Sequence, residues 1–219
     1  VAMGVQALRY NTTASNNTAV GFQAGYANTT GANNTAVGNS ALRSNTTAID
    51  NTAVGYLALY TNTTGSYNTA IGLSALKSNT TASFNLAAGF EALRDNTTGT
   101  NNVALGGYQA LIQNTTGNYN VAVGFAALKS NTTASHNTAV GYQAGFSNTT
   151  AAGNVFVGEN AGYFNTNQNN TFLGAGAGYF VTSGQKNTIL GRYNGNQNGL
   201  DLRTLDNNIV LSDGLGNVP

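Results

Sequence analysis

The sequence predicts an all-β fold, a β-solenoid (β-roll) of about twelve 17-residue coils. Three observations predict it: a repeat of fixed length, short β-favouring stretches between Gly and Asn/Thr positions, and a scarcity of charge. Only 7% of the 219 residues are charged, and the net charge is +1. Stacked coils place like side chains above one another, so charged columns would repel, whereas Asn and Thr columns can hydrogen-bond along the stack.

The repeat is marked by the glycine that closes each N-T-A-V-G box. These glycines recur at a 17-residue interval, except for one interval of 18 and one of 16, and such a period takes priority over other signals. The longer interval contains the extra Gly107, which we interpret as a bulge. Glycine at this position suits a corner that needs positive φ or close backbone approach. The coil glycines are Gly4, Gly21, Gly38, Gly55, Gly72, Gly89, Gly106, Gly124, Gly141, Gly158, Gly174 and Gly191.

Each coil is predicted to hold two or three short strands joined by tight corners. A typical coil reads N-T-A-V-G-[YF]-Q-A-[LG]-x-x-N-T-T-[GA]-x-x. A repeat of this length is too short for a propeller blade or a helical hairpin, and the spacing of a leucine-rich repeat is missing. Parallel coils stacked at about 4.8 Å would form a rod on the order of 55 Å long.

Apolar residues occur in adjacent pairs, such as Ala53-Val54 in the box and Ala58-Leu59 downstream. Successive side chains of a strand point to opposite faces, so one member of each pair should face the core and the other should face outward. The outward members would form an apolar stripe parallel to the rod axis. Covering that stripe with other copies of the chain predicts self-association into a cyclic bundle.

Residue volumes vary together within coils. Where the ninth position of a coil is Gly, as at Gly25, Gly145, Gly162 and Gly178, the next residue is aromatic. We interpret this as an exchange of volume in a packed interior, which tolerates little change in volume. Near the C-terminus, Phe156, Phe172 and Ile189 replace the small Ala of the box, so we expect the core or an interface to widen there.

The N-T-T segment supplies a second column. Its asparagines all lie in N-x-T sequons, so they are either a hydrogen-bonded corner ladder, which we favour, or a row of glycosylation sites. They are Asn11, Asn28, Asn45, Asn62, Asn79, Asn96, Asn114, Asn131 and Asn148. The same threonines could form an ice-binding hydroxyl array. Adjacent threonines such as Thr12 and Thr13 should point to opposite sides, however, which argues against that function.

Catalytic and metal-binding patterns are missing from the sequence. There is no Cys, and the one His, His136, has no partner for a triad; we expect it to be a solvated corner residue rather than a metal ligand. The acids do not share a column, so a carboxylate pair is not expected; they are Asp50, Glu91, Asp95, Glu159, Asp201, Asp206 and Asp213. We therefore predict no enzyme activity, no cofactor and no metal. Near-neutral charge and the lack of a long apolar run predict no nucleic-acid partner and no membrane insertion.

The box with Ala three residues later resembles the head repeats of trimeric autotransporter adhesins. Runs such as residues 137–144 and the closing segment 187–218 resemble bacteriophage tail-fibre proteins more closely. The resemblance covers essentially the whole chain. It implies a left-handed β-roll assembled as a parallel homotrimer, an extracellular location on a virion or cell surface, and a role in host attachment. A bacterial surface adhesin or another extracellular fibre protein is the alternative.

Two segments follow from this reading: a solenoid rod over residues 1–191 and an irregular transition or cap over residues 192–219, leading to a further domain. Val1 enters in the middle of a box, so we expect a fragment of a longer fibre. Exposed aromatic side chains at Tyr26, Tyr60, Phe146 and Tyr163 are candidates for weak contacts with host-surface glycans, although they could equally fill volume inside the roll.

Overall fold

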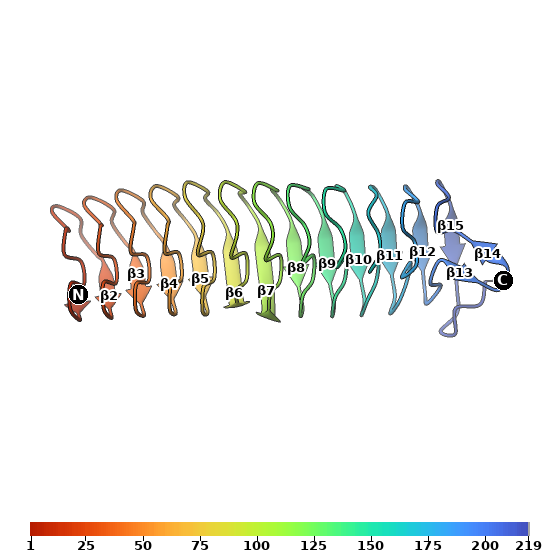
Figure 1. Cartoon of the computed structure of the whole chain (residues 1–219), viewed down its shortest axis with the longest axis horizontal. Helices are drawn as coiled ribbons and strands as arrows, with labels where there is room; N and C mark the ends of the chain where they lie inside the picture. The colour runs from red at the N-terminus through yellow and green to blue at the C-terminus, as the bar shows by residue number, and fades with distance from the viewer. Residues whose placement is uncertain (219) are drawn as a thin grey trace.

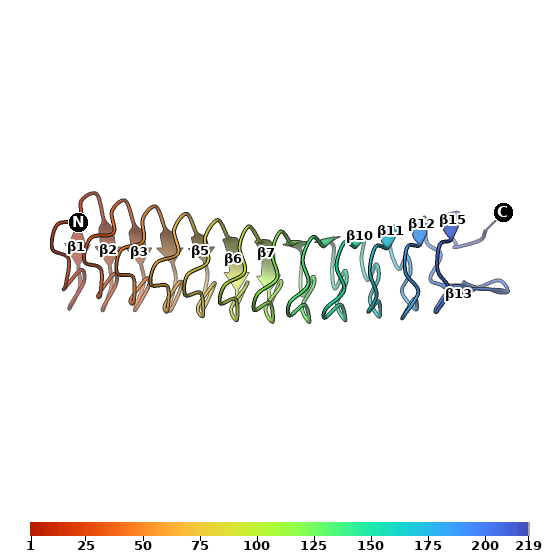
Figure 2. The same ribbon diagram turned by 90° about the horizontal axis from the view of Figure 1, so that it is seen from above.

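The chain forms a parallel β-solenoid of about twelve coils, drawn as a row of narrow loops between the two termini in Figure 1. The computed structural model describes residues 1–218; Pro219, the last residue of the predicted cap, lies outside them. A 13-stranded sheet follows the long axis in the order β1 to β12 and then β15. Equivalent residues superpose from coil to coil, so Ala36 pairs with Ala19 on one side and Ala53 on the other. Figure 2 shows the same stack of coils from above.

Most strands are three residues long. Those of the solenoid are β1 (Ala2–Met3), β2 (Thr18–Val20), β3 (Thr35–Val37), β4 (Thr52–Val54), β5 (Thr69–Ile71), β6 (Leu86–Phe90), β7 (Val103–Tyr108), β8 (Val121–Val123), β9 (Thr138–Val140), β10 (Val155–Val157), β11 (Thr171–Leu173), β12 (Thr188–Leu190) and β15 (Ile209–Leu211). A separate antiparallel pair joins β13 (Asn196–Gln197) to β14 (Leu200–Asp201).

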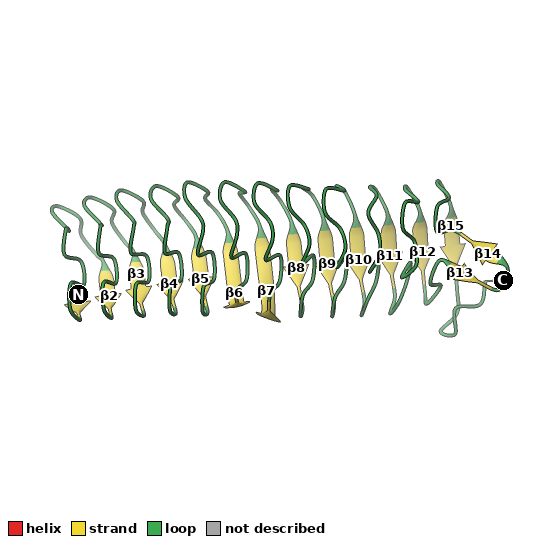
Figure 3. Ribbon diagram, in the orientation of Figure 1, coloured by secondary structure: helices red, strands yellow, loops and turns green. Residues whose placement is uncertain are grey.

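Each coil contributes one strand to this sheet, so the prediction of two or three strands was wrong; Figure 3 shows the remainder of each coil as loop. The reason is an alternation of backbone conformation after the box. Ser40 and Leu42 have φ values of 57° and 51°, and their equivalents in other coils are similar. Left-handed residues at alternate positions curl the chain. Its backbone still bonds from coil to coil, as in Leu42 N–H to the Ala58 carbonyl at 2.9 Å.

The core is a column of small and branched apolar side chains. In the box pair, Ala53 is buried and Val54 is half exposed, as predicted. In the second pair the prediction was wrong, because Ala58 and Leu59 are both buried. Leu59 has a φ of 51°, and this left-handed turn brings its side chain to the same side as that of Ala58. The apolar stripe on the outside therefore comes from the strand and not from the Leu column.

The exchange of volume does not take place between the ninth-position glycine and the aromatic residue that follows it, as expected from the sequence. It takes place between that glycine and the box residue in the core. The aromatic residues after the ninth-position glycines, such as Tyr163, are only half buried and do not fill the core. A Cβ on Gly162 would instead collide with the ring of Phe156, and a Cβ on Gly178 would collide with that of Phe172. An Ala-and-Leu coil thus becomes a Phe-and-Gly coil, in which the ring occupies the volume of the missing leucine.

Irregular coils are accommodated locally. Around Gly107 the pairing shifts between Ala88 and Phe90, and β8 resumes the regular register. The sheet also continues past residue 191, because β15 pairs in parallel with β12 across a 21-residue interval, as in Thr188 opposite Ile209. Within that interval, Tyr193 is fully buried and its hydroxyl donates to the Leu200 carbonyl at 2.6 Å. This segment covers the C-terminal end of the core.

Candidate functional site: columns along the solenoid

The coil glycines lie one above another at the end of the strand. Eleven of the twelve have positive φ, from 105° to 141°; Gly106, beside the inserted Gly107, is the exception. A Cβ on Gly38 would lie 2.5 Å from the carbonyl oxygen of Gly55 in the next coil. The column therefore requires glycine for two reasons, its backbone conformation and the close approach of the neighbouring backbone.

The N-T-T asparagines form a continuous ladder inside the corner. Asn45 donates from Nδ2 to Asn28 Oδ1 at 2.7 Å and to its own corner carbonyl at Ala48 at 3.1 Å. The same two bonds recur from Asn28 to Asn148. The Asn residues from Asn28 to Asn148 in this ladder are at most 2% exposed. Since both N–H groups of each amide are used, a glycan could be attached only before the corner has closed.

A second ladder, which the sequence analysis did not separate from the first, uses the Asn that opens each box. Asn51 N–H donates to Asn34 Oδ1 at 3.0 Å, and Asn51 Nδ2 donates to the Gly65 carbonyl at 3.0 Å. Each box Asn thus satisfies backbone groups of two coils. The signal was present in the sequence, because an Asn recurs at this position at the same 17-residue interval. The two ladders together hold the corner in register.

The first ladder ends in the 16-residue coil. Asn148 Oδ1 and Asn165 Nδ2 are the only buried side-chain polar atoms without a hydrogen-bond partner in the described part of the chain. In the next coil the equivalent position is Val181, which is fully buried. Apolar packing therefore replaces the ladder near the coils in which Phe156 and Phe172 replace the box Ala in the core.

We expect Asn62→Ala to lower the stability by about 2–4 kcal/mol, because it removes the bonds to Asn45 and Gly65 and leaves buried groups unpaired. Thr64→Ala removes the same sequon but changes an exposed side chain, so its effect should stay within about 0.5 kcal/mol. Thermal unfolding followed by circular dichroism compares the two variants. Equal destabilisation by both variants would contradict the ladder as the source of the stability.

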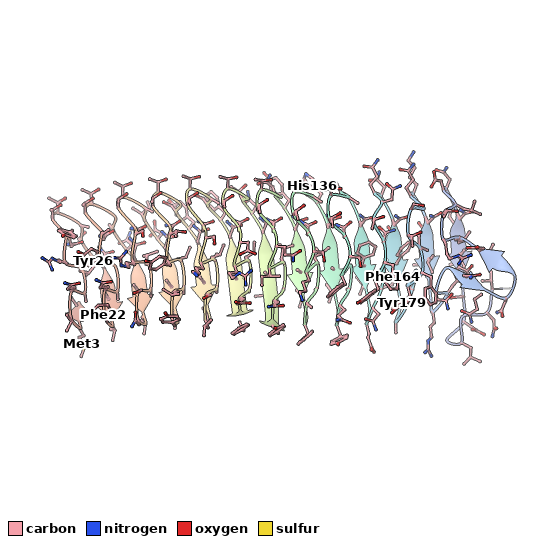
Figure 4. The ribbon with its side chains drawn as sticks, in the orientation of Figure 1. Met3, Phe22, Tyr26, His136, Phe164 and Tyr179 are labelled. Atoms are coloured by element: carbon pink, nitrogen blue, oxygen red, sulfur yellow. The ribbon has the colours of Figure 1, made fainter. Side chains whose placement is uncertain are left out.

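The outward side of the sheet carries an apolar surface, which we call the strand face. One of its columns is the last box residue before Gly, and a second is the residue after Gly. The most exposed members of the two columns are Met3, Val5, Phe22, Tyr56, Ile71, Leu73, Phe90, Tyr108, Phe125, Val140, Tyr142, Leu173, Leu190 and Leu211. Rings stack within the second column. The ring centroids of Phe90, Tyr108, Phe125 and Tyr142, taken in that order, are 5.1–5.3 Å apart. Figure 4 shows Met3 and Phe22 at one long edge and His136 at the opposite edge.

A third column carries basic and aromatic side chains, which alternate from Arg9 to Tyr60. Arg43 lies between Tyr26 and Tyr60, with its guanidinium 5.2 Å and 5.6 Å from the two ring centroids. Lys129 lies 5.5 Å from the centroid of Phe146 in the same way. Cations and π faces attract, so the alternation separates like charges and also binds neighbouring coils together. All four glycan-contact candidates of the sequence analysis lie half buried in this column.

The titratable groups are dispersed or paired. His136 is exposed and stacks on Tyr119 with centroids 5.1 Å apart. Arg94 contacts both Asp95 at 2.8 Å and Glu91 at 3.1 Å, and the Asp95 hydrogen bond raises the pKa of its guanidinium. Near the C-terminus, hydrogen bonds from Arg203 lower the pKa of Asp201. No group of three His, Cys, Asp or Glu that could hold a metal occurs in residues 1–218.

These columns define the class of the molecule: a parallel β-solenoid repeat protein with internal asparagine ladders. No protein-family model, no curated protein and no solved structure matches the chain. Among the described residues, none belongs to an apolar helix of membrane-spanning length.

Proposed function

We propose that this chain is a shaft or head section of an elongated trimeric attachment fibre, of viral origin or from a bacterial surface. Its function is mechanical: it is a stiff spacer that holds other parts of the fibre away from the surface that carries it. The proposal is supported above all by the strand face, an exposed apolar surface that runs along most of the sheet. Monomeric proteins rarely expose apolar patches of this extent, and such patches usually mark interfaces.

The shape of the strand face favours identical copies as the covering partner. Its columns are parallel to the rod axis and repeat at the spacing of one coil. A second copy in the same orientation has matching columns at the same spacing, and a cyclic arrangement buries the ring-bearing part of this face, from Val5 to Tyr142, on every copy. The interior ladders stiffen each rod, because every coil is hydrogen-bonded to both neighbours.

Sedimentation equilibrium tests the assembly: we expect three times the 22.4 kDa mass of one chain. Val54→Lys combined with Ile71→Lys should dissociate the complex, because two adjacent charges on the strand face would be desolvated in the interface. Thr47→Lys combined with Thr64→Lys places the same neighbouring charges on the exposed threonine column, and should leave the mass unchanged. A monomeric wild-type rod, or an unchanged mass for the strand-face variant, would contradict the proposed assembly.

The exposed threonine column bears on ice binding, the alternative function from a different class. The second Thr of each N-T-T segment is exposed, which gives a column from Thr13 to Thr150. The column is only one residue wide, because the first Thr hydroxyl donates along the stack, as in Thr46 Oγ1 to the Thr63 carbonyl at 3.1 Å. We therefore expect no thermal hysteresis at millimolar protein; a measurable hysteresis gap would establish ice binding instead.

A further inference from the structure

The strand face is interrupted in the 16-residue coil and the coil that follows it. At the position after Gly, where Tyr56, Phe125 and Tyr142 carry rings, Ala175 has only a methyl group. At the next position, where most other coils have a longer side chain such as Gln, Leu, Glu or Asn, Gly176 has none, and a Cβ there would meet no atom within 4 Å. These two small residues open a notch in an otherwise filled surface.

The notch is a cavity with a mixed lining. Its volume is about 400 Å³, and its walls include Tyr179, Phe180, Arg192, Asn194 and Gln197. A smaller cavity of about 160 Å³ adjoins it and adds Glu159 and Asn160. Pockets of a few hundred Å³ with aromatic walls and a few convergent polar groups are typical ligand sites.

The aromatic wall is the end of a stack. The rings of Phe146, Tyr163 and Tyr179 stack in that order, with successive ring centroids 5.0–5.2 Å apart. Phe164 packs edge-on against Tyr179, with a centroid distance of 5.2 Å. Figure 4 shows Phe164 and Tyr179 side by side near the C-terminal end. The backbone bond from Phe180 N–H to the Asn194 carbonyl aligns Asn194 with Tyr179 in the next coil. The stack therefore ends against the cavity, where a polar residue stands in place of a further ring.

Opposite charges stand at the two ends of the notch. Glu159 and Arg192 occupy the same column as Ala175, one coil before it and one coil after it. Two coils correspond to about 10 Å, which is the space for one sugar ring with its substituents. Arg192 is exposed and forms no ion pair with any residue that the structure describes. A free guanidinium suits a carboxylate, to which it can donate two parallel hydrogen bonds.

We propose that this notch binds a carboxylate-bearing sugar unit of a surface glycan. The C–H face of the ring packs against Tyr179 and Phe180, the carboxylate pairs with Arg192, and the hydroxyls reach Asn194, Gln197 and Glu159. This inference rests on the proposed attachment function. It places the glycan contact at the C-terminal end of the third column and not at the rings along its length. Rings such as Tyr26 and Tyr60 are partners of Arg43, so their faces are already occupied.

Two probes that differ in one group test the site on the full chain: galacturonic acid and galactose, each titrated and followed by saturation-transfer and chemical-shift NMR. We expect galacturonic acid to bind at least about tenfold more tightly, and Arg192→Gln to remove that preference. Ala175→Tyr should abolish binding, because it fills the notch with a residue that the same column carries at Tyr56 and Tyr142. Asn39→Tyr makes the same change at an equivalent exposed position far from the notch, and should bind as the wild type does.

If neither sugar bound, or if Ala175→Tyr bound galacturonic acid as the wild type does, the proposed site would be wrong. Equal affinity for the two sugars would contradict the role of the carboxylate. Sedimentation of the same samples separates this result from the fibre proposal. A trimer that binds no sugar contradicts only the site. A monomer that binds galacturonic acid through the notch contradicts only the assembly.

Discussion

Gly38→Ala is expected to destabilise the solenoid by more than about 3 kcal/mol, although it adds a single methyl group. Gly38 has a φ of 135°, and its added Cβ would lie 2.5 Å from the carbonyl oxygen and 2.7 Å from the carbonyl carbon of Gly55. Backbone atoms of the next coil cannot move away without losing the ladder on both sides. For a chain of this length, the loss corresponds to a fall in the unfolding midpoint of about 6–12 °C.

The matched control is Gly107→Ala. Gly107 is the inserted glycine of the 18-residue interval; its φ is not positive and a Cβ there would meet no atom within 4 Å. Its substitution should change the midpoint by no more than about 2 °C. Thermal unfolding monitored by circular dichroism measures both. If the two variants unfolded together, close stacking at the coil glycines would not be what limits the fold.

Phe156→Ala is expected to cost about 3–5 kcal/mol, because it removes a fully buried ring and leaves a cavity beside Gly162. Gly162→Leu alone should also destabilise, since a Cβ at Gly162 would collide with the Phe156 ring. The two changes together recreate the Ala-and-Leu pair found at Ala122 and Leu128. The double variant should therefore be more stable than either single variant, by at least about 1 kcal/mol.

This comparison is a double-mutant cycle and is read from denaturant unfolding of the four proteins. Additive effects of the two substitutions would show that the ring and the glycine do not share one volume. A leucine at position 162 is compatible with the backbone there: Gly162 has a φ of 62°, close to the 49° of Leu128.

The period, the strand position and the asparagine ladder could be predicted because each depends on residues that recur at one interval. The parallel pairing of successive coils follows directly from the constant spacing of glycines such as Gly38 and Gly55. The number of strands per coil could not be predicted in the same way. The second apolar pair, as at Ala58-Leu59, has ordinary β-favouring composition, and only the left-handed φ of Leu59 shows that the chain curls there.

The site was harder to predict than the fold, because it consists of exceptions to the repeat. The sequence drew attention to aromatic residues in the regular columns, such as Tyr26 and Tyr60, which prove to flank Arg43. The notch depends on two small residues, Ala175 and Gly176, and on Arg192 in the following coil. A small residue at a position that carries a large side chain in other coils forms no recognisable sequence motif. It can be recognised only once the columns are aligned in three dimensions.

The one-residue insertion at Gly107 disturbs pairing only between β6 and β7, while β8 returns to the regular register. Each regular Ala-and-Leu coil is therefore an exchangeable module, and adding or removing one changes the length of the molecule without altering the types of contact between neighbouring coils. In the gene, such a change is the duplication or loss of one tandem segment that encodes a single coil. Recombination between neighbouring copies can thus adjust reach in steps of about 4.8 Å.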